Sequence, residues 1–223
     1  MNMICKLDYF LFHEIHNNWG SPIMDQLMSW ITYSGNTPLI FLYIITVSVT
    51  VGIIYRLKYY HFTSENRISP LRKALRFMLY SFMIYGVMFG VTQGLKETTQ
   101  RPRPYEVHQV RMTVALKKTT AGEEKESFPS GHAAGAFMMV AIIGRRFGKK
   151  MQVLYIWAAL VALSRVYLGA HYPSDVIFGG FWGWFMANLI ISRLPFSNLL
   201  SKIYEGLQSR FSCFKEFSSQ DIN

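Results

Sequence analysis

The sequence predicts an all-α protein: a polytopic transmembrane helical bundle with five spans, preceded by amphipathic interfacial helices. The first observation is composition, because 51% of the 223 residues are hydrophobic and only 16% are charged, against about 25% charged in soluble domains. The second is a series of long apolar runs. The third is the clustering of basic residues in the connections between those runs. Together they exclude a disordered chain and an ordinary water-soluble domain.

Five apolar runs reach or approach the roughly 20 residues that cross a bilayer as a helix. They are Thr37–Tyr55, Ala74–Leu95, His132–Gly144, Met151–Leu168 and Val176–Ile191. The first and third contain no Lys, Arg, Asp or Glu, the second contains only Arg76, and the fourth contains only Arg165. We therefore expect a membrane-embedded core over residues 37–193.

Residues 1–36 are predicted to be an amphipathic segment at the membrane surface. Its first apolar residues recur at helical spacing: Ile4, Leu7, Phe10, Leu11 and Ile15. This stretch is too short to span and contains Asp8 and Glu14, and it lacks the uninterrupted apolar run of a signal peptide. A second short helix is expected from Pro22 to Tyr33. Residues 194–223 have a similar pattern and are predicted to form an amphipathic cytoplasmic tail.

The formal net charge of +10 arises from 23 basic and 13 acidic residues. Basic residues collect between the first and second runs, between the third and fourth, and in the tail. The positive-inside rule assigns these regions to the cytoplasm. The opposite face then holds the loop Lys96–Ser130 and the turn Gly169–Ser174. Most of the charge is thereby explained by topology, and no nucleic-acid partner is expected. Cys5 and Cys213 predict neither a zinc site nor a disulfide framework.

The first of three polar clusters on that opposite face is KETTQRPRP, residues Lys96–Pro104. Lys96 and Arg103 are two cations near a span end, on a segment stiffened by prolines. Such a pair suits a dianionic phosphate, to which arginine adds a planar, two-pronged donor set. The alternative is a basic anchor at the membrane surface.

The second cluster, SFPSGHA, opens the third apolar run at residues Ser127–Ala133. Ser130 suits a helix N-cap, and Gly131 leaves the backbone accessible. A helix N-terminus presents free N–H groups that bind anions, and His132 lies in that first turn. The alternative is a capped helix with an incidental histidine.

The third cluster is SRVYLGAHYPSD, residues Ser164–Asp175, with Arg165, His171 and Asp175. A carboxylate that accepts the proton of one imidazole nitrogen leaves the other nitrogen free to attack. The alternative is a structural His–Asp pair. A metal site is not expected, because no third ligand has suitable spacing. The three clusters together provide cations, helix N–H groups and two histidines, which suits phosphoryl transfer. The position of Asp175 favours His171 over His132 as the nucleophile.

In their order, these clusters resemble the signature of the type 2 phosphatidic acid phosphatase (PAP2) superfamily, which includes the vanadium haloperoxidases. The signature is a lysine, six residues and Arg-Pro; then Pro-Ser-Gly-His; then Ser-Arg, five residues, His, three residues and Asp. This chain matches it at Lys96 with Arg103-Pro104, at residues 129–132, and at Ser164-Arg165 with His171 and Asp175. The resemblance covers Lys96 to Asp175 and implies a PAP2-like helical core.

The resemblance implies metal-independent catalysis without a cofactor, by two steps. His171, oriented by Asp175, would form a phosphohistidine, and His132 would protonate the leaving group. The phosphoryl oxygens would be held by a further set of residues: Lys96, Arg103, Ser130, Gly131 and Arg165. The implied partners are the bilayer and a lipid substrate, which is a phospholipid, lipid A or a polyprenyl phosphate.

The implied protein is a lipid phosphatase of the bacterial inner (cytoplasmic) membrane with its site facing the periplasm. Family members that act on undecaprenyl diphosphate often have Asp where this chain has Gly131, so lipid A or phosphatidylglycerophosphate is the favoured substrate type. The loop Tyr105–Glu126 is the predicted place of headgroup selection. Three alternatives stay open: an undecaprenyl diphosphate phosphatase, a lipid-to-lipid phosphotransferase, and a non-catalytic lipid-binding or transport protein. The sequence indicates no oligomeric state.

Overall fold

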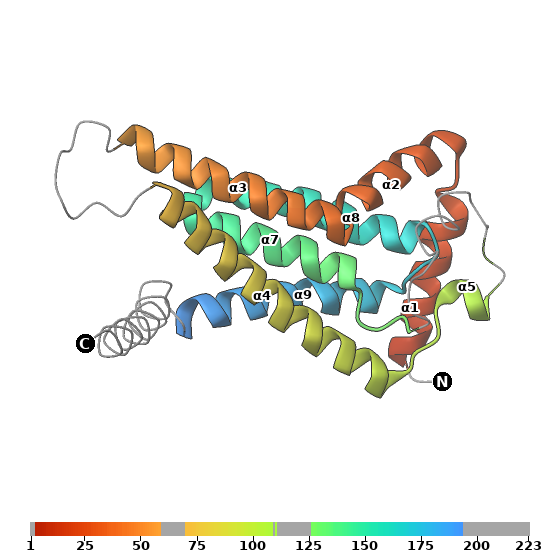
Figure 1. Cartoon of the computed structure of the whole chain (residues 1–223). Coiled ribbons are helices and arrows are strands. Elements are labelled where there is room, and N and C mark those ends of the chain that lie inside the picture. The colour runs from red at the N-terminus through yellow and green to blue at the C-terminus, as the bar shows by residue number, and fades with distance from the viewer. Residues whose placement is uncertain (1–2, 59–69, 109, 111–125, 194–223) are drawn as a thin grey trace, which may run out of the picture. The chain divides into compact units, whose positions relative to one another are not determined.

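The computed structural model describes residues 3–58, 70–108, 110 and 126–193, which fold mainly into helices (Figure 1). Contacts divide the chain into a unit Met1–Asn188 and a unit Leu189–Asn223. Of the second unit, only residues 189–193 are described. The predicted cytoplasmic tail, residues 194–223, and most of the predicted headgroup loop lie outside the described residues.

The described helices are α1 (Met3–His13), a π-helical turn η1 (Glu14–Asn18), α2 (Pro22–Ser34), α3 (Thr37–Lys58), α4 (Pro70–Thr99), α5 (Pro104–Val107), α7 (Gly131–Phe147), a 3₁₀ turn η2 (Lys149–Val153), α8 (Leu154–Tyr167) and α9 (Pro173–Arg193). The described residues contain one isolated β-bridge, Pro102 with Glu126, and no strand. The prediction of an all-α fold is confirmed.

Among the described helices, three are long and apolar enough to cross a membrane: α3, α4 and α9, of 22, 30 and 21 residues. The third and fourth predicted runs also form helices, α7 and α8, but these have only 17 and 14 residues. Large apolar side chains lie exposed along the three long helices, including Leu42 on α3, Leu79 on α4 and Phe181 on α9. An outward surface of this kind suits hydrocarbon better than water.

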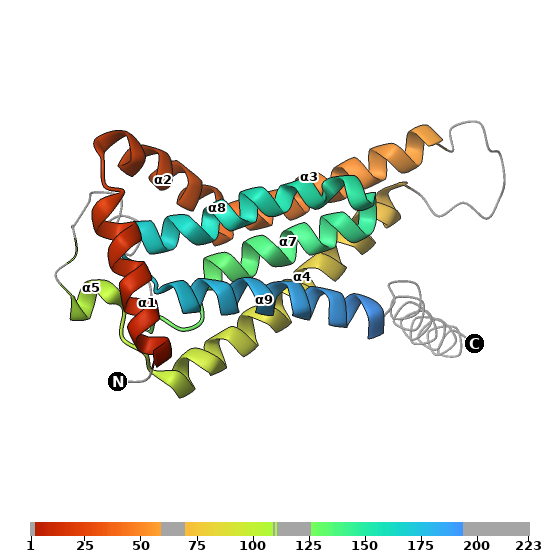
Figure 2. The same cartoon turned by 180° about the vertical axis from the view of Figure 1, so that it is seen from behind.

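Helices α3, α4, α7 and α8 run beside residues 173–188 of α9, and α1 lies across one end of this group (Figures 1 and 2). Helix α7 carries a run of fully buried small residues, Ala133 to Ala136, which lets neighbouring helices approach closely. Phe12 of α1 is 3% exposed and packs in one cluster with Ala133, Val166 and Val176. The core therefore joins the N-terminal segment to three helices of the bundle.

Local sequence determines where α2 begins, and hydrogen bonds between distant residues hold the N-terminal segment against α8. The side chain of Ser21 accepts the N–H of Met24 at 3.2 Å as an N-cap, and Pro22 takes the first helical position. Buried His16 contacts the carbonyl oxygen of Tyr167 through Nδ1 at 2.7 Å. The hydroxyl of Tyr167 donates to Asp25 at 2.6 Å. The turn η1 and the first turn of α2 are thus both hydrogen-bonded to the end of α8.

Helix α9 approaches α7 more closely than any side chain would allow. A Cβ atom added at Gly179 would lie 2.5 Å from the carbonyl oxygen of Ser130, and one at Gly183 would lie 1.9 Å from that of Ala134. These two glycines are four residues apart, as are their partners, so they form one small-residue seam between the helices. The seam positions the first turn of α7, where the second predicted cluster lies.

We predict that Gly183→Ala destabilises the protein, because its Cβ must push the α7 backbone away. Overpacking of this kind costs about 1–3 kcal/mol, and each kcal/mol lowers the melting temperature of a protein of this size by about 2–4 °C. The measurement is thermal unfolding of the detergent-purified protein.

Gly90→Ala is the matched control, because no atom lies within 4 Å of a Cβ built at Gly90 on exposed α4. Its melting temperature should stay the same or rise, since alanine favours helix more than glycine does. Equal melting temperatures for the two variants would contradict the seam.

Candidate active site

All three predicted clusters lie at one end of the helical group, where α4 and α8 end and where α7 and α9 begin. There they border a cavity of about 270 Å³. Its polar wall carries five of the eight predicted site residues: Lys96, Arg103, Gly131, His132 and His171. Its other wall is largely apolar, with Ile40 of α3 and Tyr85 and Phe89 of α4. The remaining three predicted residues, Ser130, Arg165 and Asp175, are fully buried beside it.

The three predicted cations are held in place by neighbouring oxygen atoms or aromatic rings. Lys96 Nζ donates to the carbonyl oxygen of Glu126 at 3.3 Å. Arg165 is completely buried, and its Nη1 donates to the hydroxyl of Thr32 at 3.2 Å. Arg103 is 2% exposed and lies 6.0 Å from the centre of the Tyr105 ring. Lys96 and Arg103 line the same cavity as His132, and buried Arg165 lies beside it, so the three cations gather around this site.

The first turn of α7 borders the cavity with Gly131 and His132. Ser130 is the N-cap residue, as predicted, but its hydroxyl makes no capping hydrogen bond. The N–H of Ser130 instead donates to the carbonyl oxygen of Asp175 at 3.1 Å. Its buried hydroxyl has no hydrogen-bond partner among the described residues. A buried hydroxyl without a partner is costly, and a bound oxyanion would satisfy it.

The imidazole of His171 is fixed by a residue that the sequence did not single out. Its Nδ1 lies 2.7 Å from the carbonyl oxygen of Ser127 but 3.8 Å from Asp175 Oδ2. Since a carbonyl oxygen only accepts, Nδ1 carries the proton and Nε2 keeps its lone pair. The expected tautomer is therefore reached through Ser127 rather than through a direct bond to Asp175.

Asp175 holds Ser127 in place and so supports the position of the His171 imidazole. Its Oδ2 accepts the Ser127 hydroxyl and, at 2.8 Å, the N–H of Tyr172. Tyr172 immediately precedes α9 and Asp175 is its third residue, so the second contact resembles the return bond of a capping box. This contact draws the carboxylate towards the start of its own helix, which explains why it does not reach Nδ1 of His171.

His132 is oriented by a second residue that sequence reasoning missed. Its Nε2 lies 2.6 Å from the side-chain oxygen of Asn36, in the turn between α2 and α3. An amide oxygen accepts, so Nε2 donates and the exchangeable lone pair lies on Nδ1. No pattern around Asn36 indicated this role, because its partner is 96 residues away.

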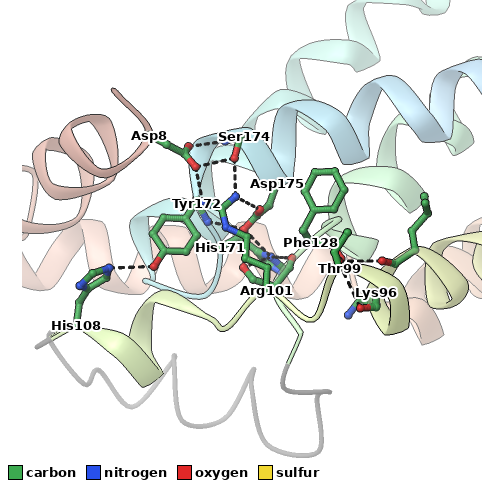
Figure 3. A network of polar contacts seen from close by, with 12 residues as sticks. Asp8, Lys96, Thr99, Arg101, His108, Phe128, His171, Tyr172, Ser174 and Asp175 are labelled. Atoms are coloured by element: carbon green, nitrogen blue, oxygen red, sulfur yellow. Dashed lines mark hydrogen bonds and ion pairs between the residues drawn. The ribbon is translucent and has the colours of Figure 1, made fainter. Parts of the chain in front are cut away.

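Asp8 and Arg101 also belong to the surroundings of the site (Figure 3). The guanidinium of Arg101 joins Asp8 and Asp175, with Nη2–Oδ2 and Nη1–Oδ1 distances that are both 2.6 Å. Burial would lower the pKa of Arg101, but the carboxylates of Asp175 and Asp8 outweigh it and raise that pKa, so the guanidinium remains cationic. Asp8 gave a sequence signal, since it is a charge within an apolar helical pattern.

This geometry suits chemistry on a tetrahedral oxyanion. Cations and the N-terminus of α7 surround the place where its oxygens would lie. One imidazole has a free nitrogen for attack, and a second can exchange a proton. The described residues contain no group of three His, Cys, Asp or Glu side chains that could hold a metal ion.

The long apolar helices and this site define an integral membrane protein with a buried, cation-rich polar site at one end of its helices. Comparison with known proteins identifies its family. The sequence profile of the PAP2 superfamily matches residues 75–198, more than half of the chain, and the chain belongs to that superfamily.

Curated relatives include a lipid A 4'-phosphatase of Bacteroides thetaiotaomicron, 40% identical over 76 residues, which are 30% of this chain and 34% of that protein. A lipid A 1-phosphatase of Rhizobium etli is 39% identical over 95 residues, 41% of this chain and 39% of that protein. The matches thus span less than half the length of these relatives. The crystal structure of LpxE from Aquifex aeolicus has the same fold, with a TM-score of 0.62 and 21% identity over 83% of this chain and 95% of that one.

We predict that inorganic phosphate binds at the cavity and raises the melting temperature of the protein. Lys96→Gln should weaken this binding about 10- to 100-fold, because a charge-assisted hydrogen bond contributes about 1.5–3 kcal/mol. The measurement is the phosphate concentration dependence of the melting temperature. Lys58→Gln, at the far, exposed end of α3, is the control for loss of one positive charge. An equal effect of both substitutions would indicate nonspecific charge screening.

Proposed function

We propose that this protein is an integral membrane lipid phosphatase that hydrolyses a phosphate monoester or diphosphate of a membrane lipid through a phosphohistidine, without a metal. One observation carries the proposal: Lys96, Arg103, His132 and His171 share one cavity that is also lined by apolar and aromatic side chains, among them Ile40, Tyr85 and Phe89. Such a cavity suits a phosphate group joined to a lipid. Membership of the PAP2 superfamily and relatives named as phosphatases support it.

In the first step, Nε2 of His171 attacks phosphorus. A nitrogen–phosphorus bond forms, the bond from phosphorus to the lipid oxygen breaks, and protonated His132 gives a proton to that oxygen. Asn36 accepts the Nε2–H of His132, which stabilises the imidazolium and leaves Nδ1 to transfer the proton. Lys96, Arg103 and Arg165, with Ser130 and the backbone of Gly131, stabilise the charge on the phosphoryl oxygens.

In the second step, water attacks the phosphohistidine. His132, now neutral, takes a proton from that water, and the nitrogen–phosphorus bond breaks. Inorganic phosphate leaves, and both imidazoles return to their starting protonation states. The hydrogen bond from His171 Nδ1 to the Ser127 carbonyl keeps the ring in position through both steps.

The proposed arrangement in the membrane has five spans, with α7 and α8 crossing beside α3, α4 and α9. Residues 1–36 lie at the membrane surface and residues 194–223 form a cytoplasmic tail. Four basic residues lie at the end of α7 away from the site, which supports a cytoplasmic position for that end: Arg145 and Arg146 in the last turn of α7, and Lys149 and Lys150 in η2. The active site then faces the periplasm from a bacterial inner membrane.

The proposed substrate is of the lipid A or phosphatidylglycerophosphate type. Lipid A phosphatases among the relatives support this choice, and so does Gly131, where family members that act on undecaprenyl diphosphate often have Asp. The apolar cavity wall of Ile40, Tyr85 and Phe89 would contact the lipid portion next to the phosphate.

We expect the detergent-purified protein to release phosphate in EDTA from one lipid in a panel of lipid A, phosphatidylglycerophosphate, phosphatidic acid and undecaprenyl diphosphate. His171→Ala should abolish release, because it removes the nucleophile, while lipid binding persists. Retained turnover in this variant would contradict the nucleophile assignment. Loss of phosphate from the donor lipid only when an acceptor lipid is present, with the phosphoryl group appearing on the acceptor and not as free phosphate, would identify a phosphotransferase instead.

Asp175→Asn should lower kcat by about 10²–10⁴, the range seen when the partner of a catalytic histidine is neutralised. The amide nitrogen replaces one of the two accepting oxygens, either Oδ2, which binds Ser127, or Oδ1, which binds Arg101, and the lost hydrogen bond disturbs the carbonyl that holds His171. The measurement is steady-state kinetics on the lipid that the wild type hydrolyses. Asp25→Asn, which affects a carboxylate bonded to Tyr167, is the control. An unchanged kcat would show that Asp175 only stabilises the fold.

A further inference from the structure

The hydrogen-bond network that holds His171 extends from Asp175 through Arg101 to Asp8 of α1. Asp8, 6% exposed, accepts Nη2 of Arg101 at 2.6 Å and also the N–H and hydroxyl of Ser174 at 2.8 and 2.6 Å (Figure 3). Nη1 of the same guanidinium donates to Asp175 Oδ1 at 2.6 Å and to the Ser174 hydroxyl at 2.7 Å. The first helix of the chain is thus linked to the turn that carries His171.

We propose that Arg101 and Asp8 are positioning residues for the reaction, acting through Asp175 and Ser127 on the imidazole of His171. The inference rests on the proposed function. Arg101 occupies one oxygen of Asp175, while the Ser127 hydroxyl and the Tyr172 N–H occupy the other. With both oxygens bound, the carboxylate cannot rotate without breaking charge-assisted hydrogen bonds.

Ser127 transmits this constraint to the nucleophile. Its N–H donates to the backbone carbonyl oxygen of Arg101 at 2.7 Å, its hydroxyl donates to Asp175, and its own carbonyl oxygen accepts from His171 at 2.7 Å. Arg101 therefore holds Ser127 both directly, through its backbone, and indirectly, through Asp175. A displacement of Ser127 moves the imidazole, and a shift of about 1 Å at a reacting group can cost about 10²-fold in rate.

The forked geometry of arginine is needed at this position. The guanidinium reaches Asp8 with one terminal nitrogen and Asp175 with the other, and its centre lies 4.1 Å from the centre of the Tyr172 ring. A lysine has a single terminal nitrogen on a flexible stem, so it cannot hold two carboxylates in a fixed plane. Arg101→Lys should preserve the charge but only part of the geometry.

Neither residue belongs to the family signature. Arg101 falls in the six-residue interval between Lys96 and Arg103, which the signature leaves unspecified, and Asp8 lies outside residues 75–198, which the family profile matches.

The test measures kcat, KM and the single-turnover rate of phosphohistidine formation, on the lipid that the wild type hydrolyses. We expect Arg101→Gln to lower kcat and the single-turnover rate about 10²-fold and Asp8→Asn about 10-fold, with KM unchanged. Arg101→Lys should recover part of the loss. The double variant Asp8→Asn/Arg101→Gln should be no slower than Arg101→Gln alone, because both substitutions interrupt one path.

Asp25→Asn is the matched control, since it removes the same charge from the same N-terminal segment without contacting Asp175. Variants that melt at lower temperature but turn over within about twofold of the wild type would overturn the inference, as would an equal loss of kcat in Asp25→Asn. If Arg101→Gln does not fold, Asp8→Asn and Arg101→Lys decide the question. An inactive wild type overturns the proposed function and this inference with it, whereas an active wild type with unaffected variants overturns this inference alone.

Discussion

The close contact between α7 and α9 is the constraint on which the site depends. Gly179 and Gly183 let the backbone of α9 touch the carbonyl groups of Ser130 and Ala134, which no larger residue would permit. The same contact allows the Ser130 N–H to reach the carbonyl oxygen of Asp175 at 3.1 Å. The first turn of α7, with His132, is therefore fixed to the turn that carries His171. The relative position of the two histidines follows from helix packing.

Burial of positive charge gives this end of the bundle its chemical character. Lys96, Arg103 and Arg165 are all less than a tenth exposed, which costs free energy unless polar groups surround them. Carbonyl and hydroxyl oxygens from Glu126 and Thr32 hold two of them in place. In a site with little water their field acts strongly on a bound anion, and they need not reorganise as charge develops. The pattern suits a dianion better than a neutral ligand.

The sequence was sufficient to predict the all-α fold and the convergence of three polar clusters, because apolar runs and local spacing determine both. It could not predict the partners of the two histidines. Asn36 reaches His132 from a turn 96 residues away, and no periodicity encodes that meeting. The spacing of His171 and Asp175 brings their side chains near each other, but the N–H of Tyr172 competes for the carboxylate. Every residue carries backbone hydrogen-bonding groups, so the sequence does not show which of them will contact a given side chain.

The N-terminal segment shows that an amphipathic pattern can predict a helix at the protein surface without showing which of its faces packs against the protein. Met3, Leu7 and Phe10 of α1 are more than half exposed, while Asp8 and Phe12 are buried. In water the charged residue would face out and the apolar ones in. The reversed arrangement is expected where the outer surroundings are lipid and the inner partner is a polar site. Because Asp8 pairs with Arg101, which also binds Asp175, the segment belongs to the hydrogen-bonded surroundings of His171. The buried charge of Asp8 is explained by that ion pair rather than by contact with solvent.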